Sequence, residues 1–409
     1  MKKSGTANLP LHYGHVPQWL AVRMRDMGRE ISLAIIESYG RDEFLSRISD
    51  PFWFQAFGAV MGMDWHSSGI TTSVMGALRK GLNPLSQETG LYILGGRGKH
   101  SRNTPAEITD VAMHTGLNGD DLVRCSKLSA KIDNTCIQDG YQLYLHNFVL
   151  TSEGKWAVIQ QGMNNENGMA RRYHWHSEEI TSFVDDPHSA IVGDNAGEIL
   201  NLCDSRAEDS RCSIVDFLSF HPDKQGTEIE KILSSRELQM PVHHDVRPEN
   251  INTKRLGAVL ATAYDRQFRK FTDALLLEGV GPRTIQALAL IAEVIYGAPA
   301  RFEDPARFSF AHGGKDGHPA PVPLKVYDES ISLLKNAVRS AKLGNSDKLN
   351  AVSKLDRLVR EIETTFSPEA DVEKLIAHER KIAKSLGGRT VFDDRKEKKK
   401  DSDLQLKLF

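Results

Sequence analysis

Residues Leu275 to Ile295 read LLLEGVGPRTIQALALIAEVI. The stretch predicts two helices joined by a tight turn, because apolar residues such as Ile285 and Leu288 recur at helical spacing in its second half. Gly279 suits the end of the first helix, where a positive φ is needed, and Pro282 suits the first turn of the second, where a missing N–H costs nothing. The turn therefore presents unpaired N–H groups and the positive end of a helix dipole, so we expect an anion to bind there.

This turn resembles the helix-hairpin-helix element of DNA-binding and DNA-repair proteins, whose hairpin reads L-x-G-V-G-P-x-T. The matching residues are Leu277, Gly279, Val280, Gly281, Pro282 and Thr284. The resemblance implies that the hairpin amides hold a backbone phosphate, which positions a protein on DNA without reading its sequence. The DNA-contact residues expected in the hairpin are Gly279, Val280, Gly281, Arg283 and Thr284. A glycine-containing turn between two core helices has the same pattern and is the structural alternative.

The chain has 409 residues, of which 40% are hydrophobic and 26% charged, as is typical of a globular protein of two or three domains. The net charge is only -2, so a surface that binds nucleic acid must be a local patch. Four cysteines without a C-x-x-C pair favour a reduced, cytoplasmic setting. No apolar run approaches the roughly 18 residues of a membrane span, so we expect no membrane association. The oligomeric state cannot be inferred from these features.

Helical and strand-like patterns alternate along the chain. Helices are predicted over residues 17–39, 50–63 and 71–80, and strands over residues 91–94, 141–150 and 156–162, the last two forming a β-hairpin. The expected fold class is α+β, mainly helical, with a central β-hairpin or sheet region and a helix-hairpin-helix element. We expect an N-terminal helical domain (1–138), a β-containing domain (139–250), a hairpin domain (251–345), a helical pair (346–389) and a disordered tail (390–409).

A glycine-rich basic loop follows the first predicted strand and reads GGRGKHSR from Gly95 to Arg102. Its glycines let a phosphate approach the backbone closely, and its cationic side chains would neutralise the charge. The spacing of a P-loop, G-x-x-x-x-G-K-S/T, is absent. We expect DNA contacts from Arg97, Lys99 and Arg102. A solvated surface loop would have the same composition.

A second stretch with chemical potential reads RRYHWHSE from Arg171 to Glu178. In an extended segment, alternate side chains lie on opposite faces. Arg171 and Arg172 would bind phosphates, Tyr173 and Trp175 would stack on unpaired bases, and the remaining side chains could move protons. The expected catalytic residues here are His174, His176 and Glu178. A plain half-buried strand with core histidines would show the same alternation.

Two further features bear on catalysis. His174 and His176 could join His188 or Asp186 around a metal ion, but no known zinc spacing is present, so no metal site is assigned. The Gly/Pro-rich segment from Phe308 to Pro319 could be an active-site loop or a connector, and its candidate catalytic residues are Lys315 and Asp316.

The charged tail from Thr390 ends in the peptide QLKLF. This peptide resembles the Q-L-x-L-F sequence with which many bacterial replication and repair proteins bind the sliding clamp. A lysine-rich segment that ends in apolar side chains suits insertion into a hydrophobic groove of a partner. The resemblance implies that Gln405, Leu406, Leu408 and Phe409 bind the clamp.

From its start to about Pro323, the chain resembles a prokaryotic family known as domain of unknown function 763. The resemblance rests on the segments 5–12, 95–99, 139–144, 160–164 and 170–175, and it implies no activity. The hairpin also resembles that of DNA glycosylases, in which a lysine attacks the sugar as a Schiff-base nucleophile. Arg283 occupies the lysine position here and cannot attack. Asp304 or Asp316 could match the assisting aspartate, and Lys315 or Lys99 could replace the lysine.

Three functions follow as hypotheses. The first is a DNA-binding protein of repair or replication-coupled processing that acts on damaged DNA as a glycosylase or abasic-site lyase, without a cofactor. The second is a metal-dependent nuclease that uses a divalent metal. The third is a non-catalytic adaptor that joins DNA to the sliding clamp.

Overall fold

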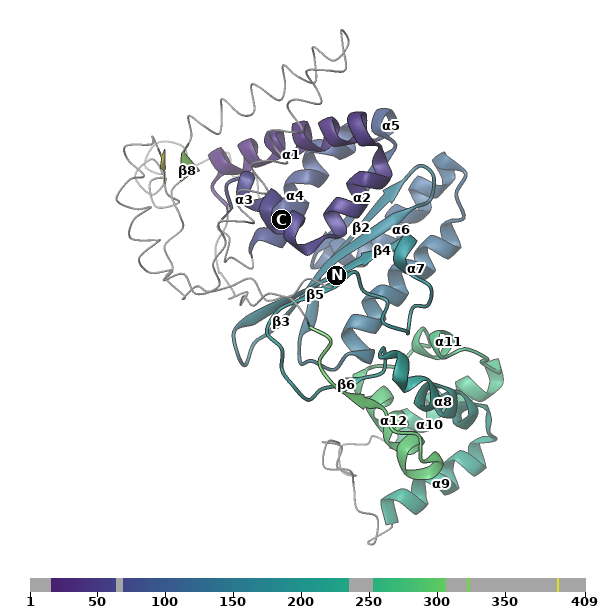
Figure 1. The fold of residues 1–409 in the computed structure, drawn as a ribbon. Coiled ribbons are helices and arrows are strands. Elements are labelled where there is room, and N and C mark those ends of the chain that lie inside the picture. Colours follow the sequence, from purple (N-terminus) through teal and green to yellow (C-terminus); the bar gives the residue numbers. More distant parts are fainter. Residues whose placement is uncertain (1–15, 64–68, 235–252, 307–321, 324–387, 390–409) are drawn as a thin grey trace.

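A five-stranded antiparallel sheet lies at the centre of the molecule, with helices on both of its faces (Figure 1). The computed structural model describes residues 16–63, 69–234, 253–306, 322–323 and 388–389. The sheet has the order β1-β2-β3-β4-β5, so each strand pairs with the next one along the chain. The strands are β1 (Leu91–Arg97), β2 (Gln142–Thr151), β3 (Trp156–Asn164), β4 (Met169–His176) and β5 (Ala190–Val192).

The predicted β-hairpin is confirmed as β2 and β3. Leu150 pairs with Trp156, and Gly154 in the connecting turn has a φ of 88°, which favours glycine. The register shifts between Leu143 and Leu145, which leaves Tyr144 without a cross-strand partner. This irregularity is a β-bulge, a feature that turns a side chain away from its regular direction.

One face of the sheet carries the N-terminal helices. Pro51 begins α3 at the position where proline is tolerated, and the side chain of Asp50 caps this helix by accepting hydrogen bonds from the Phe52 and Trp53 amides. Phe54 and Leu78 from the helices join Ile159 of the sheet in one buried hydrophobic cluster. The helices of this layer are α1 (Gln18–Tyr39), α2 (Arg41–Ser49), α3 (Pro51–Val60), α4 (Gly69–Leu82), η1 (Asn83–Leu85) and α5 (Ser86–Thr89).

The opposite face is covered by α6, α7 and the π-helix η2, and the hairpin elements pack beyond them (Figure 1). The α-helices and short helical turns here are α6 (Lys99–Thr115), α7 (Gly119–Lys131), η2 (Ile132–Cys136), η3 (Ser177–Glu179), η4 (Ser205–Ala207), α8 (Glu208–Ser219), α9 (Pro222–Ser234), α10 (Thr253–Arg266), α11 (Phe271–Leu275) and α12 (Pro282–Tyr296). Short strands pair as β6 (Leu200–Asn201) with β7 (Arg301–Phe302), and as β8 (Val322–Pro323) with β9 (Gly388–Arg389).

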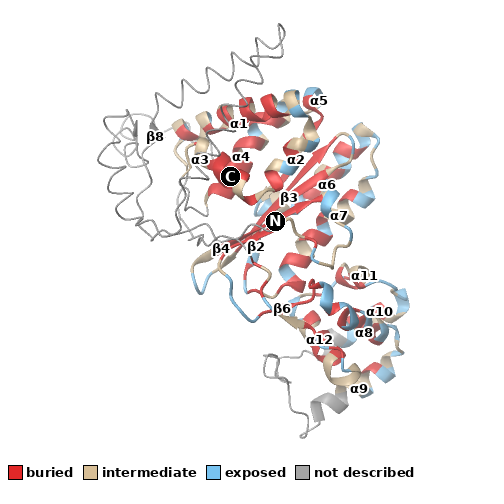
Figure 2. Cartoon of the chain, viewed as in Figure 1, coloured by how far each residue is buried: buried red, intermediate tan, exposed pale blue. Residues whose placement is uncertain are grey.

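The α+β class is confirmed, but the expected domain boundaries do not separate independent cores. The boundary at residue 138 falls between β1 and β2, which are adjacent strands of one sheet. Phe148, Trp175 and Leu288 belong to one continuous hydrophobic cluster, so the hairpin helices share their core with the sheet. Figure 2 shows the buried residues running along the strands and into the helices on both faces. No helix of the described residues is long and apolar enough to cross a membrane. The expected C-terminal helical pair and tail lie outside the described residues.

A buried ion-pair cluster joins the sheet to the segment that follows α12. The guanidinium of Arg171, on β4, donates to Asp304 at 3.1 and 2.7 Å and to Asp139 at 2.9 Å, and these three side chains are at most 1% exposed. The Tyr173 hydroxyl donates to the same Asp139 oxygen at 2.6 Å. Burial raises the pKa of Asp139 to about 6, against the lowering effects of Arg171 and Tyr173.

We expect Arg171→Leu to lower the free energy of unfolding by about 3–5 kcal/mol, because it leaves two carboxylates buried without their cation. Urea denaturation followed by circular dichroism would measure the loss. Arg102→Leu is the matched control, since Arg102 is exposed on α6 and should change stability by less than about 0.5 kcal/mol. Equal stability of the two variants would show that the cluster contributes little.

Candidate nucleic-acid interface

The hairpin turn lies between α11, which ends at Leu275, and α12, which begins at Pro282. Gly279 has a φ of 87°, as the sequence predicts, and Gly281 is extended at the start of α12. Val280 is buried against the core, whereas Pro282 and Arg283 are exposed. The turn is therefore anchored by its valine and presents its following residues to solvent.

The start of α12 offers hydrogen-bond donors. Gly281 has no side chain to cap the helix, and Pro282 has no N–H. Within the described residues, no carbonyl or capping side chain accepts from the amides of Arg283 and Thr284. These amides lie at the positive end of a 15-residue helix, a position that favours an anion.

Helix α7 runs beside the hairpin and holds it with basic side chains. Arg124 pairs with Asp273 of α11 at 2.5 Å, and Lys131 donates to the Val280 carbonyl at 2.6 Å. Lys127 lies between them along the helix and is exposed. Burial lowers the pKa of Lys131. Beyond α7, the Gln138 amide donates to the carbonyl of Pro282 at 2.8 Å.

The glycine-rich loop connects β1 to α6 through a second uncapped helix start. Gly95, Gly96 and Gly98 all have positive φ values, of 84°, 136° and 60°. A Cβ atom on Gly95 would lie 2.3 Å from the His146 carbonyl oxygen, so only glycine fits there. Gly98 occupies the N-cap position of α6 and supplies no side-chain hydrogen bond. Arg97, Lys99 and Arg102 are exposed around this helix start.

The two helix starts lie toward the same end of the α6–α7 pair. Only residues 116–118 connect α6 to α7, and a Cβ atom on Gly119 would lie 3.1 Å from that of Ala112. The two helices therefore run back along each other, which brings the start of α6 and the end of α7 to one end. Lys131, at the end of α7, contacts the hairpin. We call this region the amide face and define it by Gly98, Lys99, Lys127, Lys131, Gly281, Arg283 and Thr284.

The RRYHWHSE stretch does not lie on the amide face. Its alternation is confirmed, since Tyr173 and Trp175 pack in the core under α6 and α7, whereas the ring of His174 meets Phe54 of α3. Yet Arg171, Arg172, Tyr173, His174 and Trp175 are all 0% exposed. Strand β4 lies inside the sheet between β3 and β5, and helices cover both faces. These arginines and aromatic rings are therefore core residues and are not presented to DNA.

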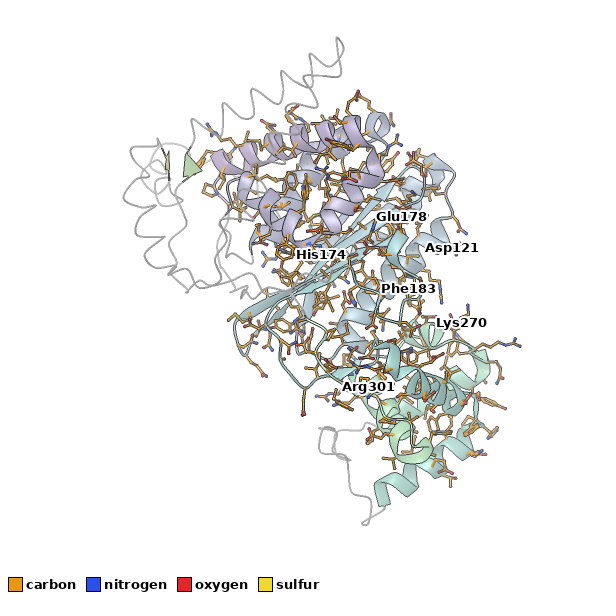
Figure 3. The ribbon with its side chains drawn as sticks, in the orientation of Figure 1. Asp121, His174, Glu178, Phe183, Lys270 and Arg301 are labelled. Atoms are coloured by element: carbon orange, nitrogen blue, oxygen red, sulfur yellow. The ribbon has the colours of Figure 1, made fainter. Side chains whose placement is uncertain are left out.

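The proposed proton-transfer set is not assembled either. His174 accepts a hydrogen bond from Arg172 at 2.7 Å, and burial together with this cation holds the pKa of His174 well below its usual value. His176 is buried, with neither ring nitrogen hydrogen-bonded. Glu178 lies beyond the end of β4, where it pairs with Lys155 at 2.6 Å (Figure 3). Among the described residues, no group of three or more His, Cys, Asp or Glu side chains is arranged to hold a metal ion.

Other expected residues are in different settings. Asp304 is buried by Arg171 and accepts from the Ala196 and Ala306 amides, so it is not free to assist chemistry on a sugar. Lys315 and Asp316 lie outside the described residues, as do Gln405, Leu406, Leu408 and Phe409.

A buried polar chain was not foreseen from the sequence. Ser126 meets His146 at 2.8 Å, His146 meets Gln160 at 2.7 Å, and Gln160 continues to Asp133 of η2. Asp133 also accepts from His188 and from the Trp175 indole. These residues are separated widely along the chain, and no local pattern links them. Lys131 and Gln138 were missed for the same reason, because each contacts a residue more than 140 positions away.

Comparison with known proteins gives one match. The family model described as protein of unknown function (DUF763) matches residues 5–322. No curated protein and no solved structure matches the chain.

Proposed function

The chain belongs to the DUF763 family, and we propose that it is a DNA-binding protein of DNA repair or replication-coupled processing. The observation that carries this proposal is the exposed hairpin turn, in which two unpaired amides, the start of α12 and Arg283 converge. Backbone amides at a helix start bind phosphate oxygens through charge-assisted hydrogen bonds. The contact carries no information about bases, so we expect binding to DNA without sequence preference.

The second helix start extends the contact. Gly98 and Lys99 begin α6, a 17-residue helix whose first amides are uncapped, and Arg97 and Arg102 flank it. Lys127 and Lys131 lie on α7, the helix that joins this start to the hairpin. The net charge of the whole chain is -2, so these cations form the local positive surface that a nucleic-acid backbone requires.

Gly281→Ala tests the hairpin with little disturbance of the fold. Gly281 is extended, which alanine tolerates, and its added Cβ would meet no atom within 4 Å. A phosphate that approaches the amides of Arg283 and Thr284 would meet this methyl group, and we expect the Kd for duplex DNA to rise by about tenfold. Fluorescence anisotropy with a labelled duplex would measure the change.

The matched control is Gly226→Ala on α9, where a Cβ also meets nothing within 4 Å. It should leave the Kd unchanged. Arg283→Ala should reduce the salt dependence of binding by the equivalent of one phosphate contact, a change of about 0.9 in the slope of log K against log salt. Wild-type affinity in both Gly281→Ala and Arg283→Ala would exclude the hairpin as the contact.

A second candidate function, an abasic-site lyase of the glycosylase type, is supported by the position of Lys131. Its amine lies 2.6 Å from the Val280 carbonyl of the hairpin, and burial lowers its pKa, which increases the fraction of neutral, nucleophilic amine. The amine would add to the C1′ aldehyde of a ring-opened abasic sugar and lose water to form an imine. A C2′ proton then passes to water, the C3′–O bond breaks with release of the phosphate-bearing strand, and hydrolysis of the imine restores the amine.

Lys131→Arg should abolish this reaction while preserving DNA binding, because arginine keeps the charge and a donor for the Val280 carbonyl but forms no imine. Borohydride trapping on an abasic oligonucleotide in EDTA would detect the imine as a covalent adduct. Lys127→Arg is the control and should be trapped like the wild type. Trapping of Lys131→Arg at the wild-type level would assign the reaction to another amine, and no trapping of the wild type would leave a DNA-binding protein without this activity. Cutting that requires Mn²⁺ would favour the nuclease alternative.

The bacterial sliding clamp is the proposed protein partner, through Gln405, Leu406, Leu408 and Phe409. A peptide of this kind binds by placing its apolar side chains in a groove, so removing residues 405–409 should weaken clamp binding at least tenfold in a surface-plasmon measurement. Leu406→Ala with Phe409→Ala in the full chain should have the same effect. Unchanged clamp binding in both proteins would contradict the assignment.

A further inference from the structure

We propose that Arg172 forms a second anion site, separate from the amide face, which takes a terminal phosphate group between β4 and the first turn of α4. The site goes beyond the proposed DNA contact, since none of its residues belongs to the hairpin. It is defined by Arg172, Thr71, Thr72, Tyr144 and Arg97.

Arg172 is a buried cation with neutral partners. Its side chain is 0% exposed, and it donates to His174 at 2.7 Å, to Thr71 at 3.3 Å and to Gln55 at 3.0 Å. Its guanidinium carbon lies 4.6 Å from the centroid of the Phe54 ring. Within the described residues, no carboxylate forms an ion pair with it. Arg171, the preceding residue on β4, has two.

This arrangement leaves a positive charge uncompensated. Burial lowers the pKa of Arg172 to about 9, so the guanidinium is still charged at pH 7. His174 accepts from it and therefore adds no negative charge. A buried ion without a counter-ion costs several kcal/mol, and proteins avoid that cost by pairing the ion or binding an opposite charge.

The first turn of α4 adds to the positive potential. Helix α4 has 14 residues and begins at Gly69, so Thr71, which contacts Arg172, lies in its first turn. The N-terminal end of a helix attracts anions. Thr71 and Thr72 are both buried, and their hydroxyls are the type of group that bonds to phosphate oxygens.

The β-bulge in β2 links this corner to the surface. Tyr144 lies at the bulge, and its hydroxyl is hydrogen-bonded to Thr72 of α4. The guanidinium of Arg97, which is exposed at the end of β1, lies 5.6 Å from the centroid of the Tyr144 ring. Arg97 therefore marks the outer edge of the site, and Arg172 marks its inner end.

The register of the sheet brings the contributing segments to one edge. Arg97, the last residue of β1, pairs with Leu145, and Arg172 near the start of β4 pairs with Gln161 near the end of β3. The ends of β1 and β3 and the beginnings of β2 and β4 therefore meet beside the first turn of α4. An arginine fork, a helix start and hydroxyl groups together match the oxygens of a phosphate group.

The burial of Arg172 selects the kind of phosphate. A phosphodiester within a continuous strand carries substituents on both sides, which a fully buried guanidinium leaves no room for. A terminal phosphate carries one substituent at most and can enter from the side of Arg97. Free phosphate, a nucleoside monophosphate and the 5′-phosphate of a DNA strand share this group.

The test compares the full chain with Arg172→Met, a replacement of similar length without charge. Binding of inorganic phosphate would be measured by isothermal titration calorimetry, and the melting temperature would be recorded in phosphate and in chloride at equal ionic strength and pH. We expect phosphate to raise the melting temperature of the wild type and the Kd for phosphate to rise at least tenfold in Arg172→Met. In chloride, Arg172→Met should be at least as stable as the wild type, because the uncompensated charge is gone.

Arg283→Ala is the control for phosphate bound at the hairpin and should keep the Arg172-dependent response. If Arg172→Met does not fold, Thr71→Val provides the second variant and should weaken phosphate binding severalfold. The same phosphate affinity in wild type and in either folded variant would overturn the proposal, as would a wild type that does not respond to phosphate.

Two further probes identify the source of the phosphate. Adenosine monophosphate and a 5′-phosphorylated oligonucleotide would be compared with inorganic phosphate in wild type and Arg172→Met. An Arg172-dependent gain in affinity for the 5′-phosphorylated oligonucleotide over its unphosphorylated form would assign the site to strand ends. Tighter binding of the monophosphate or of inorganic phosphate would assign it to a small molecule. Failure of all three probes to distinguish the two proteins would reject the site.

Discussion

The position of the hairpin depends on one buried arginine. Arg171 is fixed in the middle of the sheet by the β-ladder of β4, and its guanidinium holds Asp304 just beyond α12 and Asp139 just before β2. Because the three side chains are removed from water, none of them can be lost without leaving a charge that the interior cannot solvate. The two chain segments that border the hairpin and the sheet are therefore held at one point, and the hairpin helices pack on the same hydrophobic core as β4.

The two neighbouring arginines of β4 show how strand geometry separates chemistry. Successive side chains point to opposite faces, so Arg171 meets carboxylates on one side, whereas Arg172 meets a histidine, an amide and a hydroxyl on the other. The first environment neutralises its arginine completely and serves as a structural clamp. The second leaves a charge beside a helix start, which is an arrangement suited to a ligand. Identical residue types, one position apart, thus have different physical roles.

Local features could be predicted from the sequence, whereas burial and long-range contacts could not. The turn at Gly279 and the β2–β3 hairpin depend on residues close together in the chain, and both are found as expected. The alternation of β4 was also predictable, but alternation does not reveal whether the second face of a strand meets water or helices, so the burial of His174 and Trp175 was not. The contact of Lys131 with the hairpin depends on how α7 packs, which no local pattern encodes.

The π-helix η2 has a mechanical consequence. On its inner side, Asp133 holds the Trp175 indole and His188, and on its outer side the flanking residues Lys131 and Gln138 hold the hairpin carbonyls. A widened helical turn is thus attached to the stiffest part of the molecule and to its exposed turn at once. A load applied to the hairpin, such as the recoil of a bent duplex, would pass through η2 into the sheet and would not be absorbed by a hinge. The protein would then behave as a rigid lever on DNA, with the bending confined to the more compliant nucleic acid.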